Sequence, residues 1–257
     1  MATVADILQY IETELAPRSL KMDWDNVGLL CGSRSTPVTK ILVALDPFEG
    51  VCQEAAAWGA ELLVTHHPLI FRPLPNVTDE TSIGRGIMTL IRSGISAINA
   101  HTNLDCTEGG VNDVLAATLG LSNITPVPGD AHNLLRMGEV PQQPLEAFLA
   151  SVKENLHCEG LRYVSDGKPV QKVAVGGGSC ADGMYDALAA GCDTFVTADV
   201  KYNGFWDAKD LGLNLIDAGH FYTENPVVAV LAEKIAAAFP EITVKISESH
   251  ADCMKYY

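Results

Sequence analysis

The stretch Val64-Thr65-His66-His67-Pro68-Leu69-Ile70-Phe71 determines how the rest of the chain is interpreted. Its apolar run leads into two adjacent histidines and is stopped by a proline. In each of two later segments, 99–105 and 217–224, an apolar run also ends in a histidine, and a carboxylate lies four residues further on. Imidazole nitrogens and carboxylate oxygens are common ligands of transition metals. The three strand ends therefore predict a metal site, with two ions as the favoured number.

The composition predicts a globular protein with a large core. The chain has 257 residues, of which 47% are hydrophobic and 19% charged. It has no apolar run of about 18 residues and no signal-peptide pattern at its start, so we expect no membrane association. Seven scattered cysteines without a Cys-x-x-Cys pair favour reduced thiols and a cytoplasmic location. A net charge of −15 disfavours a nucleic-acid partner but not a small anionic substrate, because a metal supplies local positive charge.

Short apolar segments alternate with helical patterns of about ten residues, which is typical of βαβ units and largely parallel sheets. A first helix is expected over 4–15, with Thr3 and Asp6 as its capping pair. Residues 121–135, rich in Pro, Asn and Gly, are expected to form a long connection. The expected strands are 41–45, 61–65, 95–100, 170–175, 194–197, 213–217 and 242–246.

An internal echo favours a duplicated architecture. Residues 56–65 resemble residues 188–197, and a histidine follows the next apolar run in both halves. Coincidence is the alternative, since small residues often end helices before apolar strands. We predict an α/β protein of two similar, pseudo-duplicated lobes with mostly parallel sheets and the metal site in the cleft between them. The expected division is 1–125 plus 200–257 for the first lobe and 126–200 for the second, unless the lobes interleave as one domain.

Four histidines, His66, His67, His101 and His220, lie at predicted strand ends and can bind metal ions together, which a lone histidine cannot. Adjacent side chains on a regular strand point to opposite faces, so His66 and His67 favour two ions over one. His101 and Asp105, like His220 and Glu224, are either neighbours one turn apart on a helix or two arms of a loop around a cation. Glu224 is our candidate for a bridging carboxylate. The absence of paired cysteines favours an open site that retains water over a structural zinc site.

Other residues carry weaker signals. The turn Gly176-Gly177-Gly178-Ser179 either holds an anion with its amides or simply allows close packing, and both alternatives stay open. For Trp24 and Asp25 a packed ring and a turn residue are the favoured interpretation. His132, His157 and His250 have no partner at ligand spacing, so ordinary surface or hydrogen-bonding roles are expected.

Four motifs together resemble the Nif-three-like proteins, whose bacterial members carry the name GTP cyclohydrolase I type 2 homolog. The motifs are Trp24-Asp25-Asn26-Val27-Gly28-Leu29-Leu30, Thr65–Phe71, His101-Thr102-Asn103-Leu104-Asp105, and Gly219-His220 followed by Thr223-Glu224. The resemblance implies a two-lobed fold, a dinuclear metal site and a homohexameric ring built as a trimer of dimers. The implied metal ligands are His66, His67, Asp105, His220 and Glu224, with His101 as a further ligand or close neighbour.

The chain departs from the family pattern at one strand end. Many members have Thr-Gly-Glu followed by a histidine, where this chain has Thr197-Ala198-Asp199 and Asn203. This departure leaves open whether the strand end has a role at the site, and it does not affect the implied metal ligands.

The expected function is that of a metal-dependent hydrolase resembling GTP cyclohydrolase I type 2 homologs. Glu224 and His101 are the candidate catalytic residues, and the two divalent ions are Zn, Fe, Mn or Ni. The substrate is a small molecule, with nucleotides and phosphoesters as candidates. The sequence leaves open whether the protein is an enzyme, because a metal-delivery protein or a metal-stabilised interaction scaffold would use the same ligands.

Overall fold

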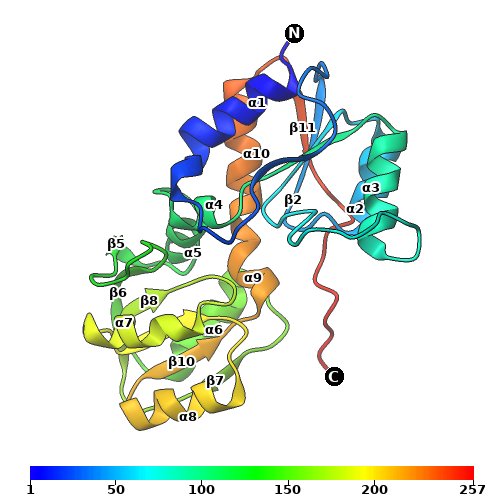
Figure 1. Ribbon diagram of the computed structural model, residues 1–257. Coiled ribbons are helices and arrows are strands. Elements are labelled where there is room, and N and C mark those ends of the chain that lie inside the picture. The colour runs from blue at the N-terminus through cyan, green and yellow to red at the C-terminus, as the bar shows by residue number, and fades with distance from the viewer. The chain divides into compact units, whose positions relative to one another are not determined.

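The computed structural model describes all 257 residues, which divide between two compact units (Figure 1). Unit 1 comprises Met1–Thr107 and Val228–Ala251, and unit 2 comprises Glu108–Val227 and Asp252–Tyr257. Each unit contains one mixed sheet with a core of parallel strands, covered by helices, so the expected α/β class with two similar lobes is confirmed. The divisions differ from those expected at 125/126 and 199/200, because the segments after Thr107 and up to Val227 pack with the second sheet.

Unit 1 is built on a five-stranded sheet in the order β1-β4-β3-β2-β11. Strands β2, β3, β4 and β11 are parallel, and β1 runs antiparallel to β4 at the edge. The elements of unit 1 are α1 (Val4–Tyr10), a π-helical turn (Ile11–Leu15), a 3-10 turn (Arg18–Leu20), β1 (Gly28–Cys31), β2 (Lys40–Ala44), α2 (Glu49–Trp58), β3 (Leu62–Thr65), α3 (Ser82–Arg92), β4 (Ser96–Asn99), α4 (Thr102–Cys106), most of α10 (Pro226–Ala238) and β11 (Thr243–Ile246).

No helix of the protein has the length and hydropathy needed to cross a bilayer.

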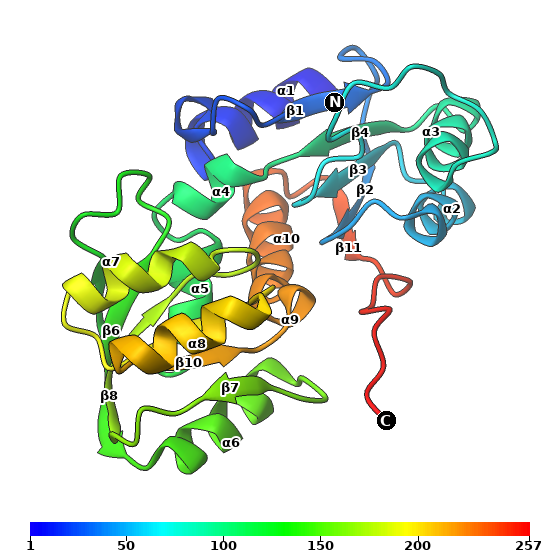
Figure 2. The ribbon, with the colours of Figure 1, turned by 60° about the horizontal axis from the view of Figure 1, so that its bottom comes forward.

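Helices cover both faces of the first sheet, with α2 and α3 on one side and α1 and α10 on the other (Figure 2). The face toward α2 and α3 is formed by alternate residues such as Leu42, Leu63 and Ala97. On the other side, the Tyr10 ring packs edge-to-face on Phe239 with centroids 5.5 Å apart, which joins α1 to the end of α10. The central strands are buried on both faces and consequently have continuous apolar sequences.

The first helix begins as the sequence predicts. Thr3 and Asp6 form a capping box, in which the Thr3 side chain accepts from the Asp6 amide and the Asp6 carboxylate accepts from the Thr3 amide at 2.8 Å. The predicted helix over 4–15 is present, with its last turn in π-helical geometry.

Unit 2 is built on a six-stranded sheet in the order β5-β6-β8-β9-β10-β7. Strands β8, β9 and β10 are parallel, whereas β5, β6 and β7 join by antiparallel pairing. The elements of unit 2 are α5 (Val111–Thr118), β5 (Ser122–Pro126), β6 (Arg136–Gln143), α6 (Leu145–Leu156), β7 (Arg162–Val164), β8 (Val170–Val175), a 3-10 turn (Ala181–Gly183), α7 (Met184–Ala189), β9 (Thr194–Thr197), α8 (Tyr202–Leu211), β10 (Asn214–Asp217) and α9 (His220–Glu224).

The expectation of a long connection over 121–135 is wrong in part, because β5 occupies Ser122–Pro126. This strand is an edge strand whose side chains are mostly exposed, and it ends in a proline. Edge strands tolerate proline and polar side chains, since one side of the backbone has no strand partner. Its sequence therefore lacks the apolar pattern of a buried strand.

The two sheets share a common plan. In each, three consecutive parallel strands (β2, β3, β4 and β8, β9, β10) are joined through helices, and the third pairs with an antiparallel strand, β1 or β7. The echoing segments 56–65 and 188–197 end in the middle strands, β3 and β9. Histidines follow β3 and β4, and Asp199 and His220 follow β9 and β10. The candidate residues thus lie at equivalent strand ends in both units.

Candidate metal centre

Three imidazoles gather at the carboxyl ends of two adjacent parallel strands in unit 1. His66 and His67 follow β3, and His101 follows β4. The ring centroids of His101 lie 5.3 Å from His66 and 5.5 Å from His67, and those of the adjacent pair are 4.8 Å apart. One nitrogen from each of the three rings lies within 4.8 Å of the others, a spacing suited to shared metal coordination. Unit 1 therefore contains a histidine cluster that can hold a metal ion.

A carboxylate joins this cluster from the short helix α4. His101 is the residue before α4, and its carbonyl accepts from the Asp105 amide at 3.1 Å. The segment is thus helical, so His101 and Asp105 are neighbours one turn apart on a helix and not two arms of a loop. Asp105 nevertheless faces a different ring, with its Oδ1 3.5 Å from Nε2 of His66. Two ligand atoms at this separation fit a common ion bound about 2.0–2.2 Å from each.

The outer nitrogen of every ring in the cluster faces an oxygen acceptor. Nδ1 of His66 is 2.9 Å from the carbonyl of Ala100, Nδ1 of His67 is 2.7 Å from Asp46, and Nδ1 of His101 is 2.8 Å from Asp25. A carbonyl or an ionised carboxylate only accepts, so Nδ1 carries the proton in each ring. Nε2 is then the nitrogen that can coordinate a metal, and such partners fix the orientation of metal-binding imidazoles.

Asp25 is a buried anchor rather than a simple turn residue. Besides His101, it accepts from the amide of Thr102 at 3.0 Å and from its hydroxyl at 2.6 Å. Burial raises the pKa of Asp25, but the hydrogen bonds from His101 and Thr102 outweigh it and lower the pKa to about 2. The expectation of a packed ring at Trp24 is also wrong, because that side chain is 63% exposed.

Unit 2 has its own imidazole–carboxylate pair on the short helix α9. This helix follows β10 and begins after Gly219, whose φ of 83° permits the sharp entry. His220 and Glu224 lie one turn apart, and Nε2 of His220 is 3.0 Å from Oε2 of Glu224. Glu224 is 5% exposed, so its carboxylate is held in the protein interior. The four-residue spacing of His220 and Glu224 is again that of a helix, and their Nε2 and Oε2 atoms face each other.

Asp199, at the strand end whose role the sequence left open, supplies the acceptor behind His220. Nδ1 of His220 lies 2.8 Å from Oδ2 of Asp199, which also accepts from the hydroxyl of Ser179. Burial raises the pKa of Asp199, but the hydrogen bonds from Ser179 and His220 lower it overall. The departure from the family pattern exchanges one acidic residue for another after β9 and keeps a carboxylate there.

The glycine-rich turn after β8 makes room for Glu224. Its amides are engaged internally: Gly176 donates to the carbonyl of Val196 at 3.0 Å, Gly177 to Oδ1 of Asn112 at 2.7 Å, and Gly178 to the hydroxyl of Thr223 at 3.0 Å. These bonds favour a packing role over anion binding. Gly178 has a φ of 61°, and a Cβ there would lie 2.1 Å from Oε1 of Glu224. Only glycine allows this approach without displacement of the carboxylate.

Asp46 and Asp199 are the site residues that sequence reasoning missed. Each is a single carboxylate just after a central strand, β2 or β9, where it looks like an ordinary turn residue. The available signal was their position, since the carboxyl ends of adjacent parallel strands converge at one edge of a sheet. His101 was found, and its contacts favour a role as a ligand.

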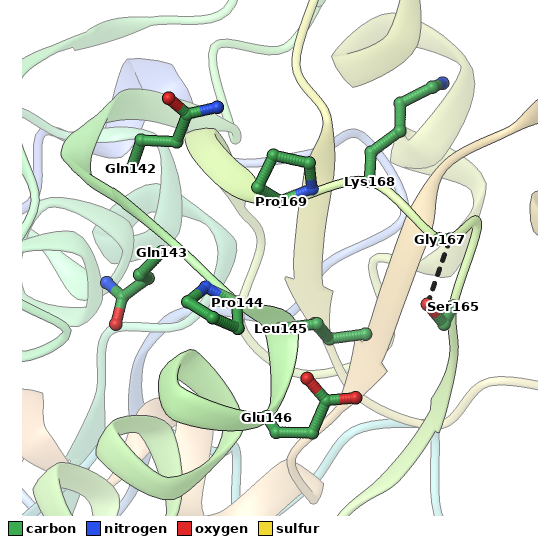
Figure 3. A pocket seen from close by; sticks show the side chains of 9 residues that line it. All are labelled: Gln142, Gln143, Pro144, Leu145, Glu146, Ser165, Gly167, Lys168 and Pro169. Atoms are coloured by element: carbon green, nitrogen blue, oxygen red, sulfur yellow. Dashed lines mark hydrogen bonds between the residues drawn. The ribbon is translucent and has the colours of Figure 1, made fainter.

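A separate pocket of about 470 Å³ lies in unit 2, between the start of α6 and the β7–β8 connection (Figure 3). Residues 142–146 line one side, and Ser165, Gly167, Lys168 and Pro169 line the other. Nζ of Lys168 is already bound to Asp166 at 2.8 Å and to the carbonyl of Gly212 at 3.0 Å. No histidine or cysteine lines this pocket, so its donors are unlike those of the histidine cluster.

Comparison with known proteins identifies the family. The model of the family Duf34/NIF3 (NGG1p interacting factor 3) matches residues 2–253. A Clostridium perfringens protein named GTP cyclohydrolase 1 type 2 homolog is 40% identical over 237 residues, covering 90% of each chain. A Staphylococcus aureus hypothetical protein superposes with a TM-score of 0.92 at 31% identity and covers 99% of both chains. A Bacillus cereus protein related to NIF3 has a TM-score of 0.93 at 25% identity, covering 100% of this chain and 99% of its own. The chain belongs to the Duf34/NIF3 family.

Proposed function

We propose that the protein is a hydrolase that depends on two divalent metal ions and acts on a nucleotide or another small phosphoester. The observation that carries this proposal is the common arrangement of its four candidate histidines. Each follows a central strand, and each has its Nδ1 within 2.9 Å of an oxygen acceptor. Core histidines need no such uniform partner on one particular nitrogen, whereas metal ligands require Nε2 to point in a fixed direction.

The donor set fits borderline divalent ions. Four imidazoles and two carboxylates suit Zn, Fe, Mn or Ni better than the all-oxygen preference of Ca. Bound ions would lower the pKa of water and polarise a phosphoryl or carbonyl oxygen of the substrate. The proposed ligands are His66, His67, His101, Asp105, His220 and Glu224.

The chain's own residues would orient those donors and leave room for the substrate. Asp25, Asp46 and Asp199 hold three rings through Nδ1. Glu224, which we propose as the bridging ligand, is buried and placed by the glycine turn. His101 is held by Asp25, and we propose that it also contacts the substrate.

The names of relatives support the substrate class only as a starting point. The Clostridium perfringens relative is named as a homolog of GTP cyclohydrolase 1 type 2, and a 31% identical Helicobacter pylori relative is named GTP cyclohydrolase 1 type 2. These names make guanine nucleotides the first substrates to test.

We further propose a cytoplasmic homohexamer. The family resemblance supports the hexamer, and the scattered cysteines support a reducing compartment. Multi-angle light scattering on purified protein gives the mass directly. A monomer or dimer at micromolar concentration would contradict the assembly without affecting the metal proposal.

The experiment is a substrate panel run on protein of known metal content. Protein is purified without added metal, analysed by inductively coupled plasma mass spectrometry, and divided into metal-loaded and chelated samples. GTP and a set of phosphoesters are then tested against both, with Glu224→Gln as the test variant. Glu241→Gln, which changes an exposed glutamate, is the matched control.

Two bound ions per chain, turnover proportional to metal content, and loss of turnover in Glu224→Gln but not in Glu241→Gln are expected. Reversible binding of metal without turnover of any substrate contradicts the hydrolase and supports a delivery role. Chelation that lowers only the melting temperature contradicts it as well and supports a structural role.

A further inference from the structure

Two exposed aromatic rings lie against His101 in unit 1. Trp24 is 63% exposed and Phe71 is 43% exposed. Their centroids are 5.8 Å apart with an interplanar angle of 80°, and they lie 6.3 Å and 6.0 Å from the His101 ring. Large exposed apolar side chains that touch each other and a polar site are typical of binding surfaces.

The loops that carry Trp24 and Phe71 are held by hydrogen bonds of the two residues that follow Trp24. Next to Trp24, Asp25 is buried and accepts three hydrogen bonds from His101 and Thr102. Nδ2 of Asn26 donates to the carbonyl of Ile70 at 2.6 Å, which ties the loop of Trp24 to the loop of Phe71. The rings are therefore held in place while their outer faces remain open to solvent.

We propose that Trp24 and Phe71 bind a planar heteroaromatic ring of the substrate beside His101. This inference rests on the proposed function, because it assigns one small molecule to both the rings and the histidine cluster. Stacking on an aromatic face is the usual way in which proteins hold an unpaired base, and it requires an exposed, fixed ring. His101 contacts both aromatic rings, so a ligand stacked there lies next to the imidazole.

The geometry favours a flat ligand over a cation enclosed in an aromatic cage. A cage needs space between its walls, with the cation within about 6 Å of each ring centroid. At 5.8 Å and near-perpendicular, the rings of Trp24 and Phe71 pack directly on each other and fill that space. A ligand must then lie on their outer faces, where a planar ring makes the largest contact.

The test compares two phosphate esters, of which only one carries a planar heteroaromatic ring. Binding of guanosine monophosphate and of ribose 5-phosphate is measured by isothermal titration calorimetry on the full chain. The test variants are Trp24→Leu and Phe71→Leu, which keep an apolar side chain but remove the aromatic face. Trp24→Phe retains an aromatic face, and Trp206→Leu removes another exposed tryptophan, from unit 2, as the matched control. Metal content and molar mass are recorded for every sample.

We expect guanosine monophosphate to bind more tightly than ribose 5-phosphate, and Trp24→Leu and Phe71→Leu each to weaken it by roughly tenfold or more. Ribose 5-phosphate should bind equally to all variants, Trp24→Phe should recover most of the affinity, and Trp206→Leu should match the parent protein. Equal affinity for the two phosphates, or an unchanged affinity for guanosine monophosphate in Trp24→Leu, overturns the inference.

A change of molar mass in the leucine variants at unchanged affinity also overturns it, and identifies the rings as a contact between copies of the chain. Tighter binding of tetramethylammonium than of guanosine monophosphate overturns it in favour of a cation site. Failure of the proposed function is distinguishable from failure of this inference. A parent protein that binds no metal contradicts the metal centre, whereas the effect of the leucine substitutions on the affinity for guanosine monophosphate is measured independently.

Discussion

His220 donates its Nδ1–H to Asp199 across 2.8 Å, although Asp199 has a left-handed backbone with φ of 53°. Left-handed geometry is uncommon for residues other than glycine, and aspartate and asparagine tolerate it best. Unit 1 has the same kind of contact between His101 and Asp25, at 2.8 Å. In both units an acidic side chain from one loop fixes the direction of an imidazole on another.

Replacement of Asp199 should weaken metal binding. Asp199→Ala removes the acceptor for His220 Nδ1, and loss of such a partner typically lowers metal affinity ten- to a hundredfold. Asp199→Asn keeps an acceptor oxygen and a residue that tolerates positive φ, so it should lose less. Zinc affinity measured by competition with a chelating dye checks this. Asp210→Ala, at an exposed position on α8, should behave like the parent protein, and an unchanged affinity in Asp199→Ala would refute the role of Asp199.

Gly178→Ala should displace Glu224, because the added Cβ would lie 2.1 Å from its Oε1. Gly191→Ala is a matched control: Gly191 also has a positive φ, at 78°, but a Cβ there meets nothing closer than 3.7 Å. Both variants should lose about 1 kcal/mol or more of unfolding free energy from the backbone alone. Only Gly178→Ala should also lose bound metal, as mass spectrometry of the purified proteins will show. Equal metal content in both would mean that Glu224 is not a ligand.

Asp25→Ala should destabilise the metal-free protein by about 2–4 kcal/mol, because it leaves His101 and Thr102 without their buried acceptor. Urea unfolding followed by circular dichroism in the presence of a chelator measures this loss without a contribution from bound ions. Asp23→Ala, two residues away and exposed, should change stability little. A small loss in Asp25→Ala would show that the loop is held by other contacts.

Glu54 should make the stability of unit 1 depend on acid pH. Burial raises its pKa, but hydrogen bonds from Ser247, Glu248 and Ser249 lower it to about 2, below the ordinary value of 4.5. Because the folded pKa is the lower one, the ionised carboxylate stabilises the fold above pH 4.5, and this contribution is lost as the pH falls toward 2.

Glu54→Gln should therefore be less stable than the parent by about 1–3 kcal/mol at pH 7, with the difference shrinking toward zero near pH 2. Urea midpoints at pH 7, 4 and 2.5 provide the measurement. Glu248→Gln, whose side chain is 81% exposed, is the control and should show little pH-dependent difference. A difference that stays constant with pH would contradict the assignment to the ionised carboxylate.

The strands with continuous apolar sequences were predictable, whereas β5, β6 and β7 of unit 2 were not. Strands such as β3 and β9 are buried on both faces, so they appear as continuous apolar runs. In β6, buried and exposed residues alternate through Arg136–Gln143, and β7 has only three residues. Their pairing depends on neighbours distant in the sequence, and local pattern does not encode it.

The same division applies to the candidate site. Histidines after apolar runs were visible as strand ends, and the structure places all four there. The partners Asp46 and Asp199 were not visible, because which loop meets which imidazole depends on the order of strands in each sheet. The exposure of Trp24 was also not predictable, since its loop is held by contacts of Asp25 and Asn26 with residues distant in the sequence.

The discontinuous make-up of unit 1 has a consequence for biosynthesis. Its edge strand β11 and the helix α10, which meets Tyr10, are translated only after the whole of residues 108–227. A ribosome-bound chain that ends before Val228 therefore exposes the unpaired edge of β2 and the uncovered side of α1. Nascent chains with an unpaired strand edge are prone to aggregation. Unit 1 can therefore complete its sheet only after the C-terminal segment has been translated.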